Sequence, residues 1–437
     1  MNPSDYISRI LAQCAVQPAL ADVYAELLLQ GAGQELYSEP LIKHTAIHGK
    51  SFGEASRRFG KAIPLGIVRP APGSGEVSTS PSGSFTLQGD EEVHLSPSDD
   101  LLLQPTDQIL LMAKSRGDTR PGRMRAAVKP PKVKAVKAAA GEETEGSKEK
   151  VKAAMEAAVA ATPNQKPPRI LLLNVDWTMP DFIEQIDEVC RSSTRTQQLQ
   201  HPPSSPLTPL PSPLQSQVAP KGASLTLFCP ERPNNLPSMS RASMKYIRGD
   251  PSSVTDMKKI AAHKYDAVIY LQPGDGSDES DSKLLLSLLA LQQSSRDEGT
   301  AMPRVVGEVH SPQMLDLIRS RWPENQWDFI QSNDLCSGIL VQFALQPELR
   351  NVYSELLASE GKEIILRPAR NYLDKPMSEL KNKYVTFEQL GLGARAKGEV
   401  AVGVHLAGEA SPILNPPRDL RLKLNDGDEL VVLGQAF

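Results

Sequence analysis

The sequence predicts an α/β protein in which a doubly wound parallel sheet is combined with helix–turn–helix segments and small β-rich lobes. Three observations lead to this fold class. Strand and helix patterns alternate between residues 169 and 330. A helical segment at the N-terminus recurs after residue 333, and a strand-rich stretch follows each copy of it. A chain of 437 residues is long enough for two or three such domains.

The clearest pattern is an internal repeat. Residues 5–28 and residues 334–357 are identical at 14 of 24 aligned positions, at a constant offset of 329. Both copies carry a proline, Pro18 or Pro347, in the middle of an amphipathic pattern. Because proline cannot continue a helix interior, each copy is predicted to form two helices joined by a turn.

The similarity continues more weakly into the strand-rich stretches. Ile63–Val68 resembles Val400–His405, Leu95–Leu101 resembles Leu414–Leu420, and Thr106–Met112 resembles Gly427–Leu433. Each copy is therefore predicted to run helix, turn, helix and small β lobe. His405 alternates with two valines along its strand, so we expect the His405 side chain to face solvent.

These patterns divide the chain into four parts. They are residues 1–115, with the first helical pair and β lobe; residues 116–168, a linker predicted to be disordered; residues 169–333, the parallel sheet with a Pro-rich insertion at 191–222; and residues 334–437, with the second helical pair and β lobe.

Within residues 169–333 the predicted sheet is Rossmann-like, and such sheets bind ligands beyond the carboxyl ends of their strands. A dinucleotide site needs glycines after the first strand, but residues 174–180 contain none. The sequence therefore favours a Rossmann scaffold without a dinucleotide site. Polar residues predicted near the strand ends remain candidates for binding a ligand: Asp176, Glu231 and Asp250.

An acidic loop follows the fourth predicted strand and contains Asp275, Asp278, Glu279 and Asp281. Carboxylate oxygens at the ligand edge of a sheet suit Ca²⁺, which makes Ca²⁺ the candidate cofactor. The spacing is not that of an EF-hand, and the distal bidentate glutamate is absent. Two interpretations stay open, a divalent-cation site and a solvated acidic loop that caps a helix.

Composition and motifs exclude several functions. Aromatic residues are only 5% of the chain and the formal net charge is -4, which argues against a nucleic acid partner. The four cysteines form no Cys-x-x-Cys pair, so neither a zinc finger nor a disulfide framework is expected. No P-loop or G-x-S-x-G motif occurs, and we expect no enzymatic activity. No apolar run has the roughly 18 residues of a membrane helix, so the chain is expected to be soluble.

The order of these parts, with several local motifs, resembles the regulator-of-conductance (RCK) domains of channels, and most of all the Castor/Pollux family of plant ion channels. The residues that carry the resemblance are Arg169–Asn174, Gly249-Asp250-Pro251, Glu308 in the sequence VVGEVH, Ser332–Leu335, Leu414–Pro417 and Gly427–Gly434. The resemblance covers residues 169–437 as one complete RCK unit, and residues 5–115 as the C-terminal part of a preceding unit.

The resemblance implies a homo-oligomer in which two RCK units per subunit form a tetrameric gating ring below a pore. It implies that ligand binding, with Ca²⁺ proposed, shifts the ring through different affinities for two ring states. It also implies membrane association through the channel, with the nuclear and plastid envelopes as candidates. The pore-forming membrane segment and the first Rossmann lobe of the family pattern are missing from this chain.

Two other functions remain open alongside a gating-ring role. One is a stand-alone oligomerisation scaffold, which would form assemblies that respond to no ligand. The other is a diverged nucleotide-binding oxidoreductase, which the Rossmann-like pattern suggests and the absent glycine loop opposes.

Overall fold

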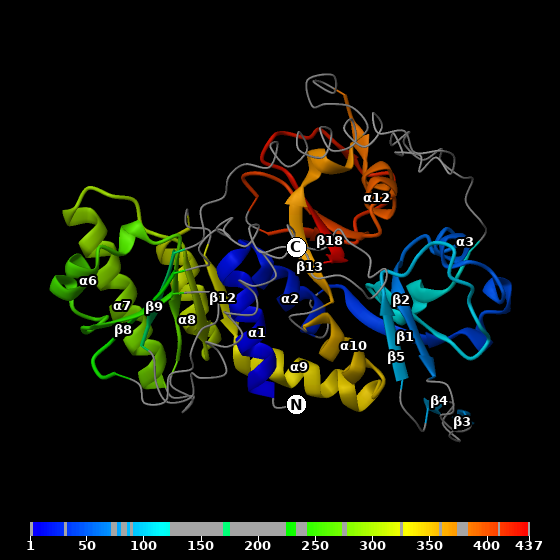
Figure 1. The fold of residues 1–437 in the computed structure, drawn as a ribbon, viewed down its shortest axis with the longest axis horizontal. Helices are drawn as coiled ribbons and strands as arrows, with labels where there is room; N and C mark the ends of the chain where they lie inside the picture. Colours follow the sequence, from blue (N-terminus) through cyan, green and yellow to red (C-terminus); the bar gives the residue numbers. More distant parts are fainter. Residues whose placement is uncertain are drawn as a thin grey trace, which may run out of the picture.

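The computed structural model describes thirteen stretches of the chain: residues 3–29, 33–70, 77–79, 85–87, 91–122, 169–174, 224–232, 243–272, 278–323, 327–357, 361–373, 383–409 and 411–435. In these stretches a six-stranded lobe lies at one end of the molecule and a small β lobe lies at the other, with four helices between them (Figure 1). A second small β lobe lies above these helices in the view of Figure 1. Of the linker predicted at 116–168, residues 116–122 are described, and they include a 3-10 helix at Arg116–Thr119 with Arg116 paired to Glu39 at 2.9 Å. The rest of the linker, residues 123–168, and the insertion at 191–222 lie outside the described residues.

The six-stranded lobe contains a fully parallel sheet. Its strands are β7 (Arg169–Leu173), β8 (Ser224–Cys229), β9 (Ser243–Arg248), β10 (Ala267–Tyr270), β11 (Val305–Val309) and β12 (Asp328–Gln331). They lie in the order β12-β11-β10-β7-β8-β9, so the chain winds outward from β7 in one direction and then outward from β10 in the other. This is the doubly wound arrangement, and the predicted α/β class is confirmed.

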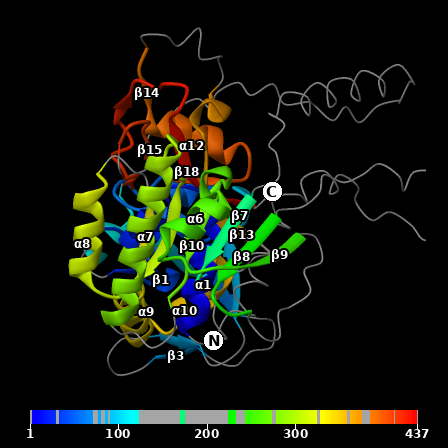
Figure 2. The ribbon, with the colours of Figure 1, turned by 90° about the vertical axis from the view of Figure 1, so that its left-hand side faces the viewer.

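One face of this sheet is covered by helices of the same lobe. They are α6 (Val254–Ile260), α7 (Asp278–Asp297) and α8 (Pro312–Arg321), and Figure 2 shows α6 and α7 in front of the strands. Leu284 and Leu288 of α7 pack in one cluster with Val268 and Tyr270 of β10. Ser311 caps α8 by accepting a hydrogen bond from the Met314 amide, with proline at the first helical position.

The four central helices form two hairpins. The N-terminal hairpin consists of α1 (Pro3–Val16) and α2 (Leu20–Leu28), and the C-terminal hairpin consists of α9 (Ser332–Leu345) and α10 (Leu349–Leu356). The two predicted prolines lie in the turns between the helices. In the N-terminal hairpin Ala19 has a positive φ of 65°, which reverses the chain before α2.

The two β lobes have the same topology. The first β lobe has strands β1 (Glu35–Pro40), β2 (Ile63–Pro70), β5 (Glu91–Leu95) and β6 (Gln108–Ala113), with α3 (Phe52–Ser56). The second β lobe has strands β13 (Lys362–Pro368), β15 (Val400–His405), β16 (Ile413–Leu414) and β18 (Glu429–Gln435), with α12 (Phe387–Arg395). The strand orders β1-β6-β2-β5 and β13-β18-β15-β16 correspond strand for strand, and all pairs are antiparallel. Two short antiparallel pairs complete the described strands: β3 (Val77–Thr79) with β4 (Phe85–Leu87), and β14 (Val385–Thr386) with β17 (Arg421–Leu422).

A shared irregularity shows that the β lobes are copies of one unit. The pairing register shifts immediately before Gly66 in β2 and immediately before Gly403 in β15. A Cβ atom at Gly66 would collide with the carbonyl oxygen of His94, and one at Gly403 would collide with that of Ile413. The bulge therefore requires glycine in both copies, because the neighbouring strand approaches too closely for any side chain.

The prediction that His405 faces solvent is wrong. His405 is 8% exposed, and Nδ1 lies 3.5 Å from Oε2 of Glu429 while Nε2 lies 3.2 Å from the carbonyl oxygen of Glu409. All residues of β15 are buried, because α12 packs against this strand as well as the central core. Alternation predicts an exposed face only for a strand that is covered on one side.

The two hairpins are joined to the β lobes in an exchanged way. Gln17, in the turn of the N-terminal hairpin, accepts a 2.9 Å hydrogen bond from the Leu366 amide in β13. Gln346, its equivalent at the offset of 329, accepts a 2.9 Å hydrogen bond from the Ser38 amide in β1. Each hairpin therefore bonds to the β lobe of the other copy.

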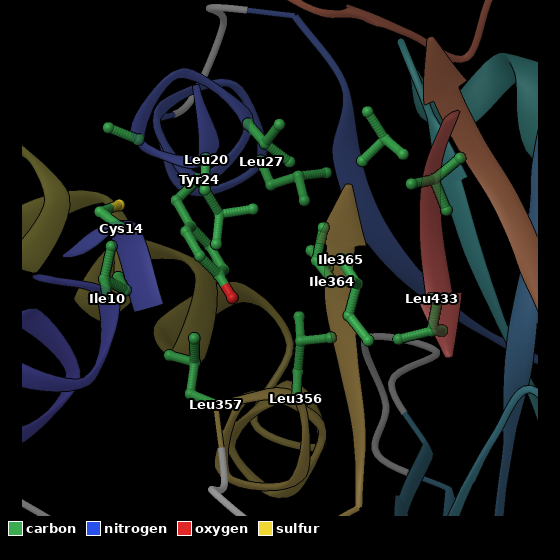
Figure 3. Packing of buried hydrophobic residues seen from close by; sticks show 14 of the residues in the cluster. Ile10, Cys14, Leu20, Tyr24, Leu27, Leu356, Leu357, Ile364, Ile365 and Leu433 are labelled. Carbon is green, nitrogen blue, oxygen red and sulfur yellow. The ribbon is translucent and has the colours of Figure 1, made fainter. Parts of the chain in front are cut away.

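A buried polar pair also repeats inside each hairpin. The Tyr24 hydroxyl donates to Oε1 of Gln13, and the Tyr353 hydroxyl donates to Oε1 of Gln342. Figure 3 shows Tyr24 among apolar side chains of both hairpins and of β13, including Leu356. In this dry core each pair satisfies polar atoms that water cannot reach.

Replacement of Tyr353 by phenylalanine should destabilise the protein, because buried Gln342 then loses its donor. We expect Tyr353→Phe and Tyr24→Phe each to lower the free energy of unfolding by about 1–3 kcal/mol in chemical denaturation. Tyr384→Phe is the control, since Tyr384 is 65% exposed. Equal stability of all three variants would contradict the importance of the buried pairs.

Candidate functional site

Two of the three predicted ligand residues, Glu231 and Asp250, lie in the described chain. Asp176 lies outside the described residues, and Glu231 is exposed two residues after β8. Asp250 is exposed after β9, where its Oδ1 accepts hydrogen bonds from the amide and hydroxyl of Ser252, at 2.9 and 2.7 Å. Asp250 thus closes a turn before α6. A ligand-binding role for these three residues stays a prediction.

The acidic loop is described only in part. Asp275 lies outside the described residues, and Asp278 is the first residue of α7. Glu279 is exposed and pairs with Lys283 at 2.9 Å, whereas Asp281 is buried. Residues two positions apart on a helix do not face each other, so Glu279 and Asp281 do not converge. In the described stretches no group of three or more His, Cys, Asp or Glu side chains could hold a metal ion. The cation site stays a prediction.

Asp281 instead organises the carboxyl edge of the sheet. Its Oδ1 accepts hydrogen bonds from Nε2 of Gln272, at 2.7 Å, and from the His310 amide, at 3.1 Å. Its Oδ2 accepts a 2.9 Å hydrogen bond from the Ser311 amide. A buried carboxylate needs such donors to offset its lost hydration. Asp281 therefore ties the first turn of α7 to the end of β10 and the start of α8.

A histidine between two carboxylates lies beside this group. His310 Nδ1 is 3.7 Å from Oδ1 of Asp281, and Nε2 is 3.7 Å from Oε1 of Glu308. The His310 side chain is only 11% exposed. Burial raises the pKa of Glu308, and the charge of His310 opposes that rise. We define Gln272, Asp281, Glu308 and His310 as the edge cluster.

Sequence analysis singled out two of these four residues, Asp281 from the acidic loop and Glu308 from the resemblance. It missed Gln272 and His310. Only their positions could have indicated these two residues, because Gln272 follows β10 and His310 directly follows β11 at the ligand edge of the sheet.

The edge cluster lies against the start of α9. Glu308 in β11 is paired with Ile330 in β12, and α9 begins directly after β12 at Ser332. Cys336 in α9 has a pKa raised by burial and further by the charge of Glu308. A change of charge in the edge cluster therefore acts on the first turns of α9.

The opposite edge of the sheet holds the N-terminal hairpin. Arg304 binds Asp328 at 2.7 Å and donates to the carbonyl oxygens of Cys14 and Ala15, the latter at 3.0 Å. Asp328 accepts a 3.3 Å hydrogen bond from the Ala21 amide. A cation thus meets the carboxyl end of α1 and an anion meets the amino end of α2, which both helix dipoles favour.

Comparison with known proteins confirms the resemblance predicted from the sequence. Residues 4–129 match the family model for Castor and Pollux, part of voltage-gated ion channel. The chain is 20% identical to the probable ion channel POLLUX of Arabidopsis thaliana, over 99% of this chain and 47% of the relative. It is 21% identical to the ion channel CASTOR of Lotus japonicus, over 94% of this chain and 43% of the relative. The chain spans less than half the length of these relatives.

The fold is similar to a solved gating ring. The human SLO3 gating ring superposes with a TM-score of 0.60 at 10% sequence identity, over 100% of this chain and 76% of that chain. At this identity the likeness concerns the fold. No helix in the described part of the chain is long and apolar enough to cross a membrane.

Asp281→Asn tests whether the Asp281 carboxylate stabilises the fold, in contrast to the exposed carboxylate of Glu279. The amide offers one acceptor oxygen where the carboxylate offers two, so we expect a loss of about 1–3 kcal/mol in the free energy of unfolding. Glu279→Gln in the same helix removes only an exposed ion pair and should cost less than about 0.5 kcal/mol. Denaturant titration of both variants measures the difference, and equal losses would contradict the role assigned to Asp281.

Proposed function

Because this chain is similar to Castor and Pollux ion channels over nearly its whole length, we propose that it is the regulatory, ring-forming part of a Castor/Pollux-like cation channel. In this role the chain is not an enzyme. It binds a ligand and passes the resulting change of shape to a pore-forming membrane segment outside this chain. The likeness in sequence and the gating-ring fold support the proposal.

One structural observation carries the proposed coupling. Helix α9 begins at the edge cluster and leads to Gln346, which bonds to both Ser38 and Leu36 of the first β lobe. A helix of 14 residues is about 21 Å long. It can therefore transmit a displacement from the ligand edge of the sheet to a distant lobe as one rigid element. A ligand would drive this displacement only if it bound one of the two positions more tightly.

The edge cluster is the proposed sensing site. Its carboxylates and imidazole are shielded from water, so a bound cation or a change of protonation would alter the local field strongly. Ca²⁺ remains the candidate ligand, with Glu308 as a carboxylate donor at this edge, because both oxygens of Asp281 already accept hydrogen bonds.

Ring assembly needs a contact between copies, and the outer surface of α7 and α8 offers an apolar one. Leu286 and Leu289 of α7 are 54% and 40% exposed, and Leu317 of α8 is 44% exposed. Arg321 joins the two helices by a 3.4 Å hydrogen bond to Gln292. Exposed apolar patches commonly mark interfaces. We place the contact between subunits of a tetrameric ring, with two RCK units each, on this patch.

Calorimetric titration of the chain with Ca²⁺, K⁺ and nucleotides tests the sensing role. We expect heat from at least one of these ligands, and a loss of affinity of at least about tenfold in Glu308→Gln, since a charged partner at the site is removed. Glu279→Gln is the matched control and should bind normally. If no ligand produced heat while ring-sized particles were still present, the sensing role would be excluded and the oligomerisation scaffold would be supported. NADH fluorescence that changes on mixing with the protein would instead support the oxidoreductase alternative.

The proposed ring contact predicts a change of particle mass. Leu289→Glu together with Leu317→Glu places charges in the apolar patch and should convert ring-sized particles into smaller ones in light scattering. Leu102→Glu is the control, because Leu102 is 64% exposed in the first β lobe, away from the patch. Rings that survive the double substitution would place the contact elsewhere.

A further inference from the structure

The contact between the two β lobes follows the internal symmetry of the chain. Ser96 of the first β lobe donates a 2.8 Å hydrogen bond to the carbonyl oxygen of Gly398 in the second. Asn415 is the equivalent of Ser96, and it donates a 2.8 Å hydrogen bond to the carbonyl oxygen of Lys61, the equivalent of Gly398. Ser96 and Asn415 also share a positive φ, of 45° and 43°. Each β lobe therefore presents the same surface to the other, and equivalent positions can be compared directly.

One pair of positions in this contact forms an ion pair. Arg395, the last residue of α12, reaches Asp99 in the first β lobe, with 2.9 Å between Nε and Oδ1. Arg395 also donates a 3.0 Å hydrogen bond to the carbonyl oxygen of Pro97, and its guanidinium lies 5.1 Å from the centre of the Phe52 ring. A carboxylate, a carbonyl and an aromatic face thus hold this guanidinium.

The equivalent pair of positions holds two arginines. Arg58 is the equivalent of Arg395, and Arg418 is the equivalent of Asp99. Nη2 of Arg418 lies 3.5 Å from the carbonyl oxygen of Ser56, the last residue of α3, and Arg58 follows two residues later. Both arginines therefore lie at the same end of α3, and both are half-buried. Like charges placed together oppose the contact of the two β lobes.

The Arg58 side chain has a donor without an acceptor. Its Nε is buried and has no hydrogen-bond partner in the described stretches. A buried donor of a charged group is costly to leave unsatisfied, so it points to an acceptor that the described chain does not supply. Arg418 contributes its positive charge at this point, whatever hydrogen bonds its other nitrogen atoms make.

The charge of the two arginines selects the chemistry of the acceptor. A carboxylate carries one negative charge, whereas a phosphate monoester carries about 1.5 to 2 at pH 7. The planar fork of N–H groups in arginine also matches the oxygen atoms of phosphate. A phosphate group between Arg58 and Arg418 would therefore turn their repulsion into attraction.

We propose that Arg58 and Arg418 form a binding site for a phosphate group between the two β lobes, at the point that is equivalent to the Arg395–Asp99 ion pair. The phosphate group takes the place of the carboxylate that Arg418 replaces, so its binding tightens the contact of the lobes. Such a site is possible in a scaffold as well as in a channel subunit, so it is independent of the proposed gating role.

Calorimetric titration of the full chain with pyrophosphate tests the site. We expect binding that Arg58→Gln weakens at least about tenfold, because a charged donor is removed from the anion. Arg57→Gln is the matched control. Arg57 is exposed, and its Nε donates a 3.2 Å hydrogen bond to the carbonyl oxygen of Gly53 in α3. The control should change the affinity by less than about twofold, since exposed charges are screened. Absence of binding to the wild type, or an equal loss in both variants, would overturn the proposal.

Arg418→Asp provides a second test, because it recreates the ion pair of the equivalent position within the chain. Without any added anion this variant should raise the melting temperature by at least about 2 °C, and it should no longer bind pyrophosphate. A variant that is more stable than the wild type cannot lose binding through unfolding. Unchanged pyrophosphate affinity in Arg418→Asp would overturn the proposal, and so would a lower melting temperature.

Two further titrations distinguish the source of the phosphate group. Inorganic phosphate that raises the melting temperature of the wild type but not of Arg58→Gln would identify a soluble ligand. Sedimentation of the wild type, but not of Arg58→Gln, with phosphatidylcholine vesicles that contain phosphatidic acid would identify a lipid headgroup. Either result supports the site. If the melting temperature of the wild type and Arg58→Gln rose equally and both sedimented equally, the phosphate group would bind elsewhere and the proposal would be overturned.

Discussion

The arrangement of the molecule depends on how proline-containing turns leave helix ends unsatisfied. Pro18 and Pro347 each lie in the turn of one hairpin. Because proline has no amide hydrogen, each also removes a donor for the last carbonyl groups of the preceding helix. In the N-terminal hairpin Arg304 and Asp328 supply the missing donor and acceptor from the edge of the six-stranded sheet. The turn between the two helices is therefore also the point at which the six-stranded lobe contacts the hairpin. Backbone groups, and not the shape of side chains alone, orient this lobe.

The exchanged contacts of the hairpins have the same cause, because they too provide hydrogen-bond partners for backbone groups. Gln17 and Gln346 each complete a backbone amide in the β lobe of the opposite copy. At Gly338 the backbone of α9 comes so close to the carbonyl of Leu28 that a Cβ atom would not fit. The hairpins therefore pack backbone to backbone, and one continuous core joins both hairpins, one face of the parallel sheet and both β lobes. Movement of any one part changes the packing of the others.

Most of the fold could be predicted because its signals are local or repeated. Strand–helix alternation predicts the parallel sheet, and the repeat at 5–28 predicts both hairpins with their prolines. The exchange of hairpins between lobes could not be predicted, because identical glutamines satisfy either pairing. His405 was assigned to the wrong side because alternation does not reveal a strand covered on both faces. Only Asp281 and Glu308 of the edge cluster could be identified from the sequence. Gln272 and His310 join the cluster because the ends of β10 and β11 lie side by side in the folded sheet.

The contacts of α9 set an energetic bound on the transmission proposed for this helix. One end of this helix lies against a buried group of charges, and the other end is held to β1 by Gln346. Each hydrogen bond of this kind contributes a net stabilisation of about 1 kcal/mol. The coupling free energy between two allosteric sites is typically about 1–3 kcal/mol. If a ligand binds the edge cluster as proposed, it therefore needs only a modest difference in affinity to exchange one position of α9 for another. The barrier to larger movement is the shared core, so the helix is suited to move between discrete positions rather than to bend.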